Sequence, residues 1–149
     1  MTNPLEQYSQ PQKTEKTKCG TLFWLNPRKS KPGREFIPLY DERFPFIAGF
    51  KARFLYYSNF LEKNNTSGNH YHHIKQEILI PLQGDFEVVL EAVGTKEKET
   101  ISLHSDEHTA LYIPTVISHK ITSKEDRGVL LVVASTPSSD DDEIEYKIE

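Results

Sequence analysis

The 149-residue sequence predicts an all-β domain with a barrel or double-sheet jelly-roll architecture. Short runs rich in aromatic and aliphatic residues recur along the chain, and many are bounded by Gly, Pro, Asn or Asp, as strands in a meander or Greek key are. No segment of a dozen residues shows a helical period. About nine strands at this close spacing indicate a sheet that closes into a barrel or folds into two packed layers.

The expected strands follow from the apolar runs taken in chain order. Residues 86–91 alternate imperfectly between apolar and polar side chains, as a strand with one solvated face does. Gly84 is expected to let the chain reverse after the apolar run at residues 78–82. The full set of expected strands covers residues 21–25, 36–40, 53–57, 77–82, 86–92, 99–103, 110–113, 118–122 and 129–134.

The length fits one domain that is large enough to bury a core. Residues 1–18 are rich in Gln, Lys, Thr and Pro and are expected to form a disordered N-terminal tail. The jelly-roll domain is assigned to residues 19–139. Residues 140–149 hold six acidic side chains against one lysine and are expected to form an acidic C-terminal tail, in which residues 144–148 leave room for one short strand or turn.

Composition and charge limit the classes of partner and the cellular compartment that we expect for this protein. The net charge of −4 and the scattered basic residues argue against a nucleic-acid surface. Cys19 is the only cysteine, so an intramolecular disulfide is excluded and a reducing compartment is the simpler expectation. No apolar run is long enough to span a bilayer, and the polar N-terminus does not resemble a secretion signal. We therefore expect a soluble cytoplasmic protein without a membrane partner.

The chemistry of the chain is concentrated in the run Gly68-Asn-His70-Tyr-His72-His-Ile-Lys-Gln-Glu77. His70 and His72 point to the same side of an extended strand, because strand side chains repeat every two residues. Glu77 cannot share that face on one unbroken strand, so a turn over residues 73–76 would have to aim its carboxylate back toward the histidines. A further imidazole, His119, follows Pro114 later in the chain.

Three histidines and a glutamate that converge inside a barrel can hold a divalent metal or serve as acid and base on a bound substrate. Each residue also has a simpler interpretation. His70 and His72 can decorate a loop, Glu77 can be a solvated carboxylate in a turn, and His119 can be a rim histidine bonded to backbone. His73 faces away from its neighbour His72 and is left out of the site.

The pattern Gly-x-His-x-His-x4-Glu-x6-Gly, followed by Pro-x-Val-x-x-His, resembles the two motifs of the cupin superfamily. The first motif matches in spacing and composition. The second departs from the usual pattern, because cupins usually carry Gly where this chain has Val116 and Asn where it has Ser123. The resemblance implies a cupin (RmlC-like) jelly-roll barrel with the site at its mouth.

A narrower resemblance runs from about Gly33 to the C-terminus and is to the WxcM-like nucleotide-sugar 3,4-ketoisomerases. It rests on an ordered series of motifs: Phe44–Phe46, Arg53–Ser58, the Gly-x-His-x-His block, Ala110–Pro114 with His119, and Leu131–Ser135. The resemblance implies an enzyme that isomerises dTDP-4-keto-6-deoxyglucose, without a required cofactor, in the synthesis of deoxyamino sugars for bacterial surface polysaccharides. A homodimer is expected from the family and from the exposed edges of a β-rich chain.

The same resemblance assigns roles to individual residues. His70 and His72 match the paired catalytic histidines, and Tyr57 (or Tyr56) matches a tyrosine ahead of them. We expect Tyr57 in the catalytic set and assign substrate binding to Tyr56, Arg53, Arg34 and His119.

Two departures leave alternatives open. Ser67 stands where the family commonly has an arginine, and Glu77 stands where it often lacks a carboxylate. In having Glu77 the chain is similar to a zinc-carrying cupin domain that epimerises a UDP-sugar. The alternatives are therefore a zinc sugar epimerase or an Fe(II) dioxygenase, with zinc, iron or nickel held by His70, His72, Glu77 and His119, or a sugar-binding cupin without catalysis.

Overall fold

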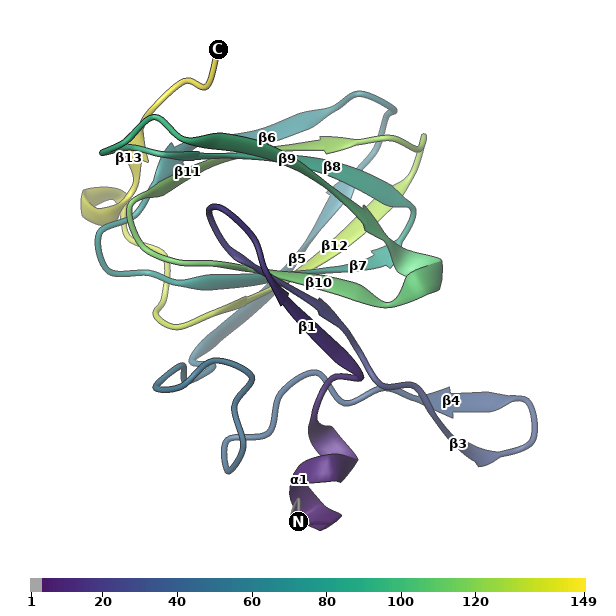
Figure 1. The fold of residues 1–149 in the computed structure, drawn as a ribbon. Helices are drawn as coiled ribbons and strands as arrows, with labels where there is room; N and C mark the ends of the chain where they lie inside the picture. The colour runs from purple at the N-terminus through teal and green to yellow at the C-terminus, as the bar shows by residue number, and fades with distance from the viewer. Residues whose placement is uncertain (1–3) are drawn as a thin grey trace.

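The computed structural model describes residues 4–149, and its body consists of two antiparallel sheets that close on each other as a barrel (Figure 1). The six-stranded sheet has the order β1-β2-β10-β7-β12-β5, and the five-stranded sheet has the order β13-β6-β11-β8-β9. Apart from the consecutive pairs β1-β2 and β8-β9, neighbours in both sheets are not consecutive in the chain, as in a jelly roll. The all-β class expected from the sequence is confirmed.

The strands of the six-stranded sheet are β1 (Lys13–Lys16), β2 (Thr21–Trp24), β10 (Thr109–Ile113), β7 (Glu77–Gln83), β12 (Gly128–Ala134) and β5 (Phe54–Phe60). Those of the five-stranded sheet are β13 (Ile144–Glu145), β6 (Thr66–Tyr71), β11 (Ile117–Ser123), β8 (Asp85–Ala92) and β9 (Lys98–His104). A separate hairpin pairs β3 (Arg28–Lys31) with β4 (Arg34–Phe36). The helical elements are α1 (Pro4–Ser9), η1 (Ser105–Glu107) and η2 (Asp140–Asp142).

The core lies in two places, one on each side of the six-stranded sheet. Alternate residues of β8, among them Phe86, Val88 and Leu90, fill the barrel interior. On the outer face of the six-stranded sheet, Phe23 and Phe50 belong to a second buried cluster, which the loop at residues 37–52 covers. This double coverage explains why the first five residues of β7 are all buried instead of alternating.

That same loop accounts for the one expected strand that does not form. Residues 36–40 were expected to be extended and paired, but β4 ends at Phe36 and residues 37–40 belong to no strand. Pro38 has no backbone N–H to donate to a ladder, and the apolar side chains beside it, including Ile37 and Leu39, pack instead against the second buried cluster. Gly84 makes the expected reversal between β7 and β8, with a φ of 82°.

Residues 4–18 differ from the disordered tail that the composition predicts for residues 1–18, and residues 1–3 of that tail lie outside the described residues. Residues 4–9 form α1, and β1 pairs with β2 in the register Lys13↔Trp24 to Lys16↔Thr21. All four side chains of β1 are exposed. The strand is held through its backbone, and a composition argument that looks for apolar side chains to bury does not detect such pairing.

The C-terminal segment, residues 138–149, also differs from a free acidic tail. It forms η2 and then β13, which pairs with β6, and Ile148 beyond it is buried. Figure 1 shows this segment, in yellow, crossing one end of the barrel. We call that end the mouth; β6, β10 and β12 end there, and β5, β7 and β11 begin there.

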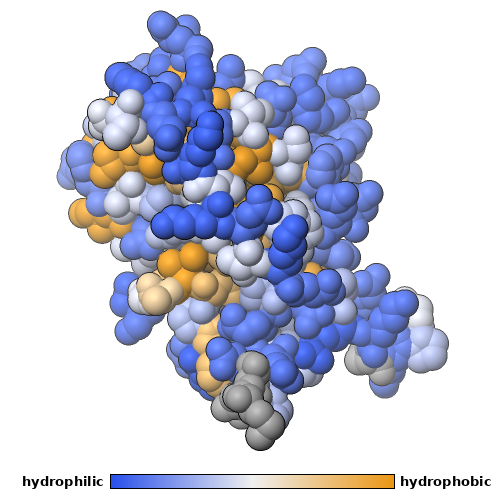
Figure 2. All heavy atoms as spheres, in the orientation of Figure 1, coloured by the Kyte–Doolittle hydropathy of each residue, from blue (hydrophilic) through white to orange (hydrophobic). Residues whose placement is uncertain are grey.

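The β3–β4 hairpin leaves the barrel on the side away from the C-terminal segment (Figure 1). In the view of Figure 2 the hairpin is almost entirely hydrophilic, whereas apolar areas appear over the barrel. Among residues 4–149, no helix has the length and apolar character that crossing a membrane requires.

Candidate active site at the mouth of the barrel

Strand pairing brings the first two histidines of the site together. In the ladder between β6 and β11, His70 lies opposite His119. Gly68 permits this approach, because its φ of 104° suits glycine and a Cβ there would collide with the carbonyl oxygen of His119. The backbone N–H of Val116 donates to the carbonyl oxygen of His72 at 2.8 Å and ties the third histidine to the start of β11.

The three imidazoles form one cluster. Ring centroids are 4.7 Å apart for His70 and His119, 5.0 Å for His70 and His72, and 5.7 Å for His72 and His119. One ring nitrogen from each lies within 4.8 Å of the others. His72 and His119 are buried, whereas His70 is partly exposed. A single small ligand or ion can therefore touch this group.

Glu77 connects the cluster to two further side chains. The turn at residues 73–76 places it as the first residue of β7, where it is buried. Its Oε1 lies 3.3 Å from His72 Nε2 and 3.5 Å from His119 Nε2. Its Oε2 accepts a 3.3 Å hydrogen bond from the Tyr56 hydroxyl and lies 3.7 Å from Lys75 Nζ.

The C-terminal segment fixes the orientation of His72. The carbonyl oxygen of Asp142 lies 2.6 Å from His72 Nδ1, and a carbonyl can only accept, so Nδ1 carries the proton and Nε2 faces Glu77. The Asp142 carboxylate accepts hydrogen bonds from the backbone N–H groups of His73, Ile74 and Lys75. One residue outside the long strands therefore holds both His72 and the turn that follows it.

A cavity of about 150 Å³ lies against this cluster. Its wall is polar toward the mouth and apolar deeper in the barrel. The polar lining consists of Tyr56, Ser58, Ser67, His70, Lys75, Glu77, His119, Ser138 and Glu143, and the apolar lining consists of Phe60, Leu79, Ile121, Leu130 and Val132. His72 is not among these residues, but its Nε2 lies 3.3 Å from Oε1 of Glu77, which is among them.

The environments of the histidines shift their pKa values in opposite directions. Burial lowers the pKa of His70, although Glu143 partly offsets this, and burial lowers the pKa of His119 to about 4. Burial also opposes protonation of His72, but the Glu77 carboxylate outweighs it and raises the pKa of His72. Glu77 itself resists the effect of burial because His72, His119 and Lys75 surround it, and its pKa falls to about 2.

The donor set also fits a divalent metal. His72 Nε2 and Glu77 Oε1 are buried, point toward each other and have no hydrogen-bond partner among the described residues. Imidazole nitrogens and a carboxylate are ligands that zinc and iron(II) accept. His70, His72, His119 and Glu77 are the residues that could hold such an ion.

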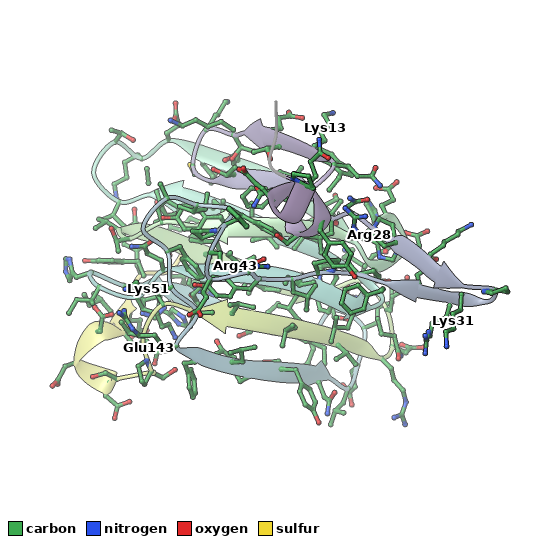
Figure 3. All side chains as sticks on the ribbon, turned by 90° about the horizontal axis from the view of Figure 1, so that it is seen from below. Lys13, Arg28, Lys31, Arg43, Lys51 and Glu143 are labelled. Carbon is green, nitrogen blue, oxygen red and sulfur yellow. The ribbon has the colours of Figure 1, made fainter. Side chains whose placement is uncertain are left out.

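Three residues expected at the site do not line the cavity. Tyr57 is 63% exposed on the outer face of β5, because it follows the inward-facing Tyr56 and strand side chains alternate. Arg34 belongs to the β3–β4 hairpin, whose tip with Lys31 lies at the opposite side of the molecule from Glu143 (Figure 3). Arg53 lies just before β5, with an exposed side chain, and does not line the cavity.

Four residues of the site were missed by the sequence argument: Lys75, Ser138, Asp142 and Glu143. Lys75 and Glu77 are both buried, although the charged and polar side chains of residues 75–77 suggest a turn exposed to solvent. The other three lie in or beside the acidic tail. The apolar alternation at residues 144–148 was the available signal, since a strand there had to pair near the histidines.

The sequence of this barrel and its C-terminal segment matches one family model. The family model described as "WxcM-like, C-terminal" (FdtA) matches residues 41–147, which span the barrel from the covering loop to the C-terminal segment. The chain belongs to the WxcM-like family. A search of curated proteins found no match for this WxcM-like protein.

Solved structures share the fold of this WxcM-like protein. A variant of the 3,4-ketoisomerase QdtA from Thermoanaerobacterium thermosaccharolyticum, in complex with TDP-4-keto-6-deoxyglucose, is 22% identical, with a TM-score of 0.73 over 87% of this chain and 88% of that one. The WlaRB TDP-quinovose 3,4-ketoisomerase from Campylobacter jejuni is 22% identical, with a TM-score of 0.75 over 87% and 94%. A dTDP-4-dehydrorhamnose 3,5-epimerase from Bacillus anthracis is 14% identical, with a TM-score of 0.76 over 88% and 81%. These likenesses confirm the RmlC-like barrel.

Proposed function

We propose that this protein is a nucleotide-sugar 3,4-ketoisomerase, which moves a ketone between C4 and C3 of a dTDP-linked 6-deoxyhexose. The observation that carries the proposal is a pair of imidazoles two residues apart and beside a cavity, in which burial lowers the pKa of His70 and the Glu77 carboxylate raises the pKa of His72. Environments that push two titratable groups apart are how enzymes assign base and acid at one pH. Family membership and the activities named for QdtA and WlaRB support the same reaction.

The geometry divides the work between the two histidines. His70 lines the cavity and has a lowered pKa, so it is available as a neutral base at C3. The His72 ring centroid lies 5.0 Å from that of His70, its pKa is raised by Glu77, and its Nε2 faces the Glu77 carboxylate. Tyr56, whose pKa is raised by burial and by Glu77, stays a neutral hydroxyl that donates to Glu77, and its oxygen can accept a hydrogen bond from a sugar hydroxyl.

The reaction needs no outside oxidant or reductant. The base takes the C3 proton, the C3–H electrons form a C3–C4 double bond, and the carbonyl electrons move to O4. The resulting enediolate takes a proton on O4 and becomes an enediol. The enediol then loses the O3 proton, the C3 ketone forms, and C4 receives a proton. C3 is oxidised and C4 is reduced within one molecule, so proton carriers and charge stabilisation are all that the protein supplies.

The cavity accounts for the sugar but not for the nucleotide. Its volume of about 150 Å³ is below the several hundred ångström cubed of sites that enclose whole ligands. The nucleotide and its diphosphate would lie outside, at the mouth. Lys51 and Arg53, in the exposed chain before β5, are our candidates for the diphosphate, and Figure 3 shows Lys51 on the same side of the molecule as Glu143.

The deciding experiment is NMR of the product after incubation of the protein with dTDP-4-keto-6-deoxyglucose. We expect a 3-keto product and, in deuterated water, exchange of the C3 proton. The His70→Asn variant serves as the matched control, because it keeps the shape of the side chain and loses the base. Unchanged substrate with the wild-type protein would contradict the assignment to this sugar.

A metal-dependent cupin, such as a zinc sugar epimerase, is a second candidate. It is favoured by the buried, unpartnered His72 Nε2 and Glu77 Oε1, with His70 and His119 beside them. A bound divalent ion would supply Lewis-acid polarisation of a sugar oxygen. Metal analysis of protein purified without chelator, with calorimetric titration of Zn²⁺ into wild type and Glu77→Gln, separates the candidates. A stoichiometric ion that is lost in the variant would favour the metal; none would favour the metal-free isomerase.

We further propose a cytoplasmic homodimer. Cys19 is free and buried, which suits a reducing compartment. Strand β5 is an edge strand whose outer face exposes Leu55 and Tyr57, and a partner that covers it would remove both an open edge and an apolar surface. Light scattering after size-exclusion chromatography tests this proposal, and a mass of one chain would contradict it.

A further inference from the structure

We propose that Lys75 is a catalytic residue, whose ammonium binds the keto oxygen of the sugar and stabilises the negative charge that develops there. The proposal rests on the proposed ketoisomerase function. It names a group that the imidazole pair cannot replace, because a base that removes a proton does not by itself stabilise the oxyanion left behind.

The first observation is the burial of Lys75. Its side chain is 6% exposed, and lysine is almost never buried this far unless it is paired. It stands in the turn between His72 and Glu77, and it lines the cavity together with Ser138 and Tyr56. The chain therefore directs a cation into the cavity instead of letting it reach solvent.

The second observation is that the ammonium is under-partnered. It has three donors, and the hydrogen bond it makes within residues 4–149 goes to Ser138 Oγ, at 3.2 Å. Glu77 Oε2, at 3.7 Å, attracts the charge but lies beyond hydrogen-bond distance. Buried donors without acceptors cost free energy, so the spare N–H groups of Lys75 indicate an oxygen that a ligand brings.

The third observation is that Lys75 is held at both ends. Its backbone N–H donates to the Asp142 carboxylate at 2.9 Å, and its Nζ donates to Ser138 of the same C-terminal segment. The Tyr56 ring lies 5.8 Å from Nζ on another side. A donor fixed before the substrate arrives stabilises a transition state without reorganisation, which is the condition for strong electrostatic catalysis.

Charge in the cavity explains why a cation is needed. The lining includes two carboxylates, Glu77 and Glu143, which would repel an anionic enediolate. Among the described residues that line the cavity, Lys75 is the one lysine or arginine. When the C3–H bond breaks, its proton goes to His70 and the carbonyl electrons go to O4, where the Lys75 ammonium donates a hydrogen bond and offsets the new charge.

The test compares Lys75→Met with wild type and with Lys63→Met, an exposed lysine between β5 and β6 at the end of the barrel away from the mouth. We expect kcat on dTDP-4-keto-6-deoxyglucose to fall roughly 10²- to 10³-fold in Lys75→Met, the range for removal of one oxyanion donor, with KM changed little. Exchange of the C3 proton in deuterated water should slow by the same factor. Lys63→Met should match wild type in both measurements.

A second variant keeps the proposal testable if Lys75→Met does not fold. Lys75→Ala leaves space for a small amine, and we expect added methylammonium, but not methanol, to restore part of kcat. A folded Lys75→Met with wild-type kcat, or a Lys75→Ala whose kcat methylammonium does not raise, would overturn the role of Lys75 alone. Wild-type protein that isomerises no keto sugar would instead overturn the proposed function, and the role of Lys75 with it.

Discussion

The wall of the cavity is built from two regions that differ in how they hold their side chains. On one side, β5, β6 and β11 present Tyr56, His70 and His119, and hydrogen-bonded ladders fix each position. On the other side, the C-terminal segment presents Ser138 and Glu143 from chain that is mostly outside strands. The strands supply the reacting groups, and the segment orients them. The difference shows that the barrel strands form only part of this site. The C-terminal segment, residues 138–149, completes it, and we call this segment the strap.

The strand side of this comparison predicts the largest loss. We expect His70→Asn to lower kcat/KM by roughly 10³-fold or more, because a general base alone contributes about 10²- to 10⁴-fold. His72→Asn should also abolish most turnover, since it removes the imidazole whose Nε2 lies 3.3 Å from Glu77 Oε1. Steady-state kinetics check both. His73→Asn, an exposed neighbour, is the control, and equal damage from it would break the assignment.

The strap side predicts a smaller but clear loss. Asp142→Ala removes three hydrogen bonds to the backbone of the 73–76 turn. Loss of a supporting group of this kind typically costs about 10- to 100-fold in activity, and the bonds themselves about 1–3 kcal/mol of stability. Kinetics and thermal unfolding of the variant measure the two effects. Asp141→Ala, an exposed neighbour, should behave as wild type; if Asp142→Ala does too, the strap has no positioning role.

The two tyrosines of β5 sharpen the comparison within a single strand. Tyr56→Phe deletes the hydroxyl that donates to Glu77 inside the cavity, and we expect about a tenfold loss in kcat, in line with a hydrogen bond to a charged group. Tyr57→Phe removes a hydroxyl on the outer face and should leave kcat unchanged. The reverse pattern would restore the tyrosine assignment made from sequence.

The pH profile reports on the two imidazoles separately. Activity should fall at acid pH as His70 gains a proton. This fall should occur at a pH below the pKa of a free imidazole, because burial lowers the pKa of His70. Activity should fall at alkaline pH as His72 loses its proton, above the ordinary value, because its pKa is raised. Glu77→Gln removes the carboxylate charge that raises the pKa of His72, so the alkaline limb of the kcat/KM profile should move to lower pH. An unmoved limb would show that another group sets it.

The smallest effect is expected at Val116, in the turn that leads into β11. Its φ is 61°, a left-handed conformation that is a real outlier for a β-branched residue. Val116→Gly should relieve about 1 kcal/mol of strain and raise Tm by roughly 2–4 °C. Calorimetry measures the shift. Ile117→Val, next in the chain and without this strain, serves as control, and a lower Tm for Val116→Gly would show that contacts of the valine outweigh its strain.

Most of the strand side could be predicted from the sequence. The alternation of His70 and His72, the turn before Glu77 and the reversal at Gly84 all follow from local rules on strands and turns. The meeting of His70 with His119 depends on pairing between distant strands, and the motif order supplied that expectation. The same alternation rule, applied to Tyr56 and Tyr57, could not decide which of them faces inward.

The strap side could not be predicted, because its contacts are made by backbone groups and by charged residues. Composition describes residues 140–149 as solvated, yet Asp142 is satisfied by three backbone N–H groups. Arg34 illustrates the opposite error: the sequence argument assigned this basic residue to substrate binding, but the β3–β4 hairpin carries it away from the mouth. Tertiary placement decides both cases, and neither leaves a periodic signal.

The burial pattern of the strap bears on how relatives of this protein could diverge. Glu143 and Ser138 touch the cavity, but neither belongs to the two buried clusters that hold the barrel together. Substitutions there can reshape the chamber at little thermodynamic expense, whereas changes on the strands disturb packed neighbours. New sugar preferences should therefore arise first through substitutions at Ser138 and Glu143, and a directed-evolution library at these two positions should contain few unfolded variants.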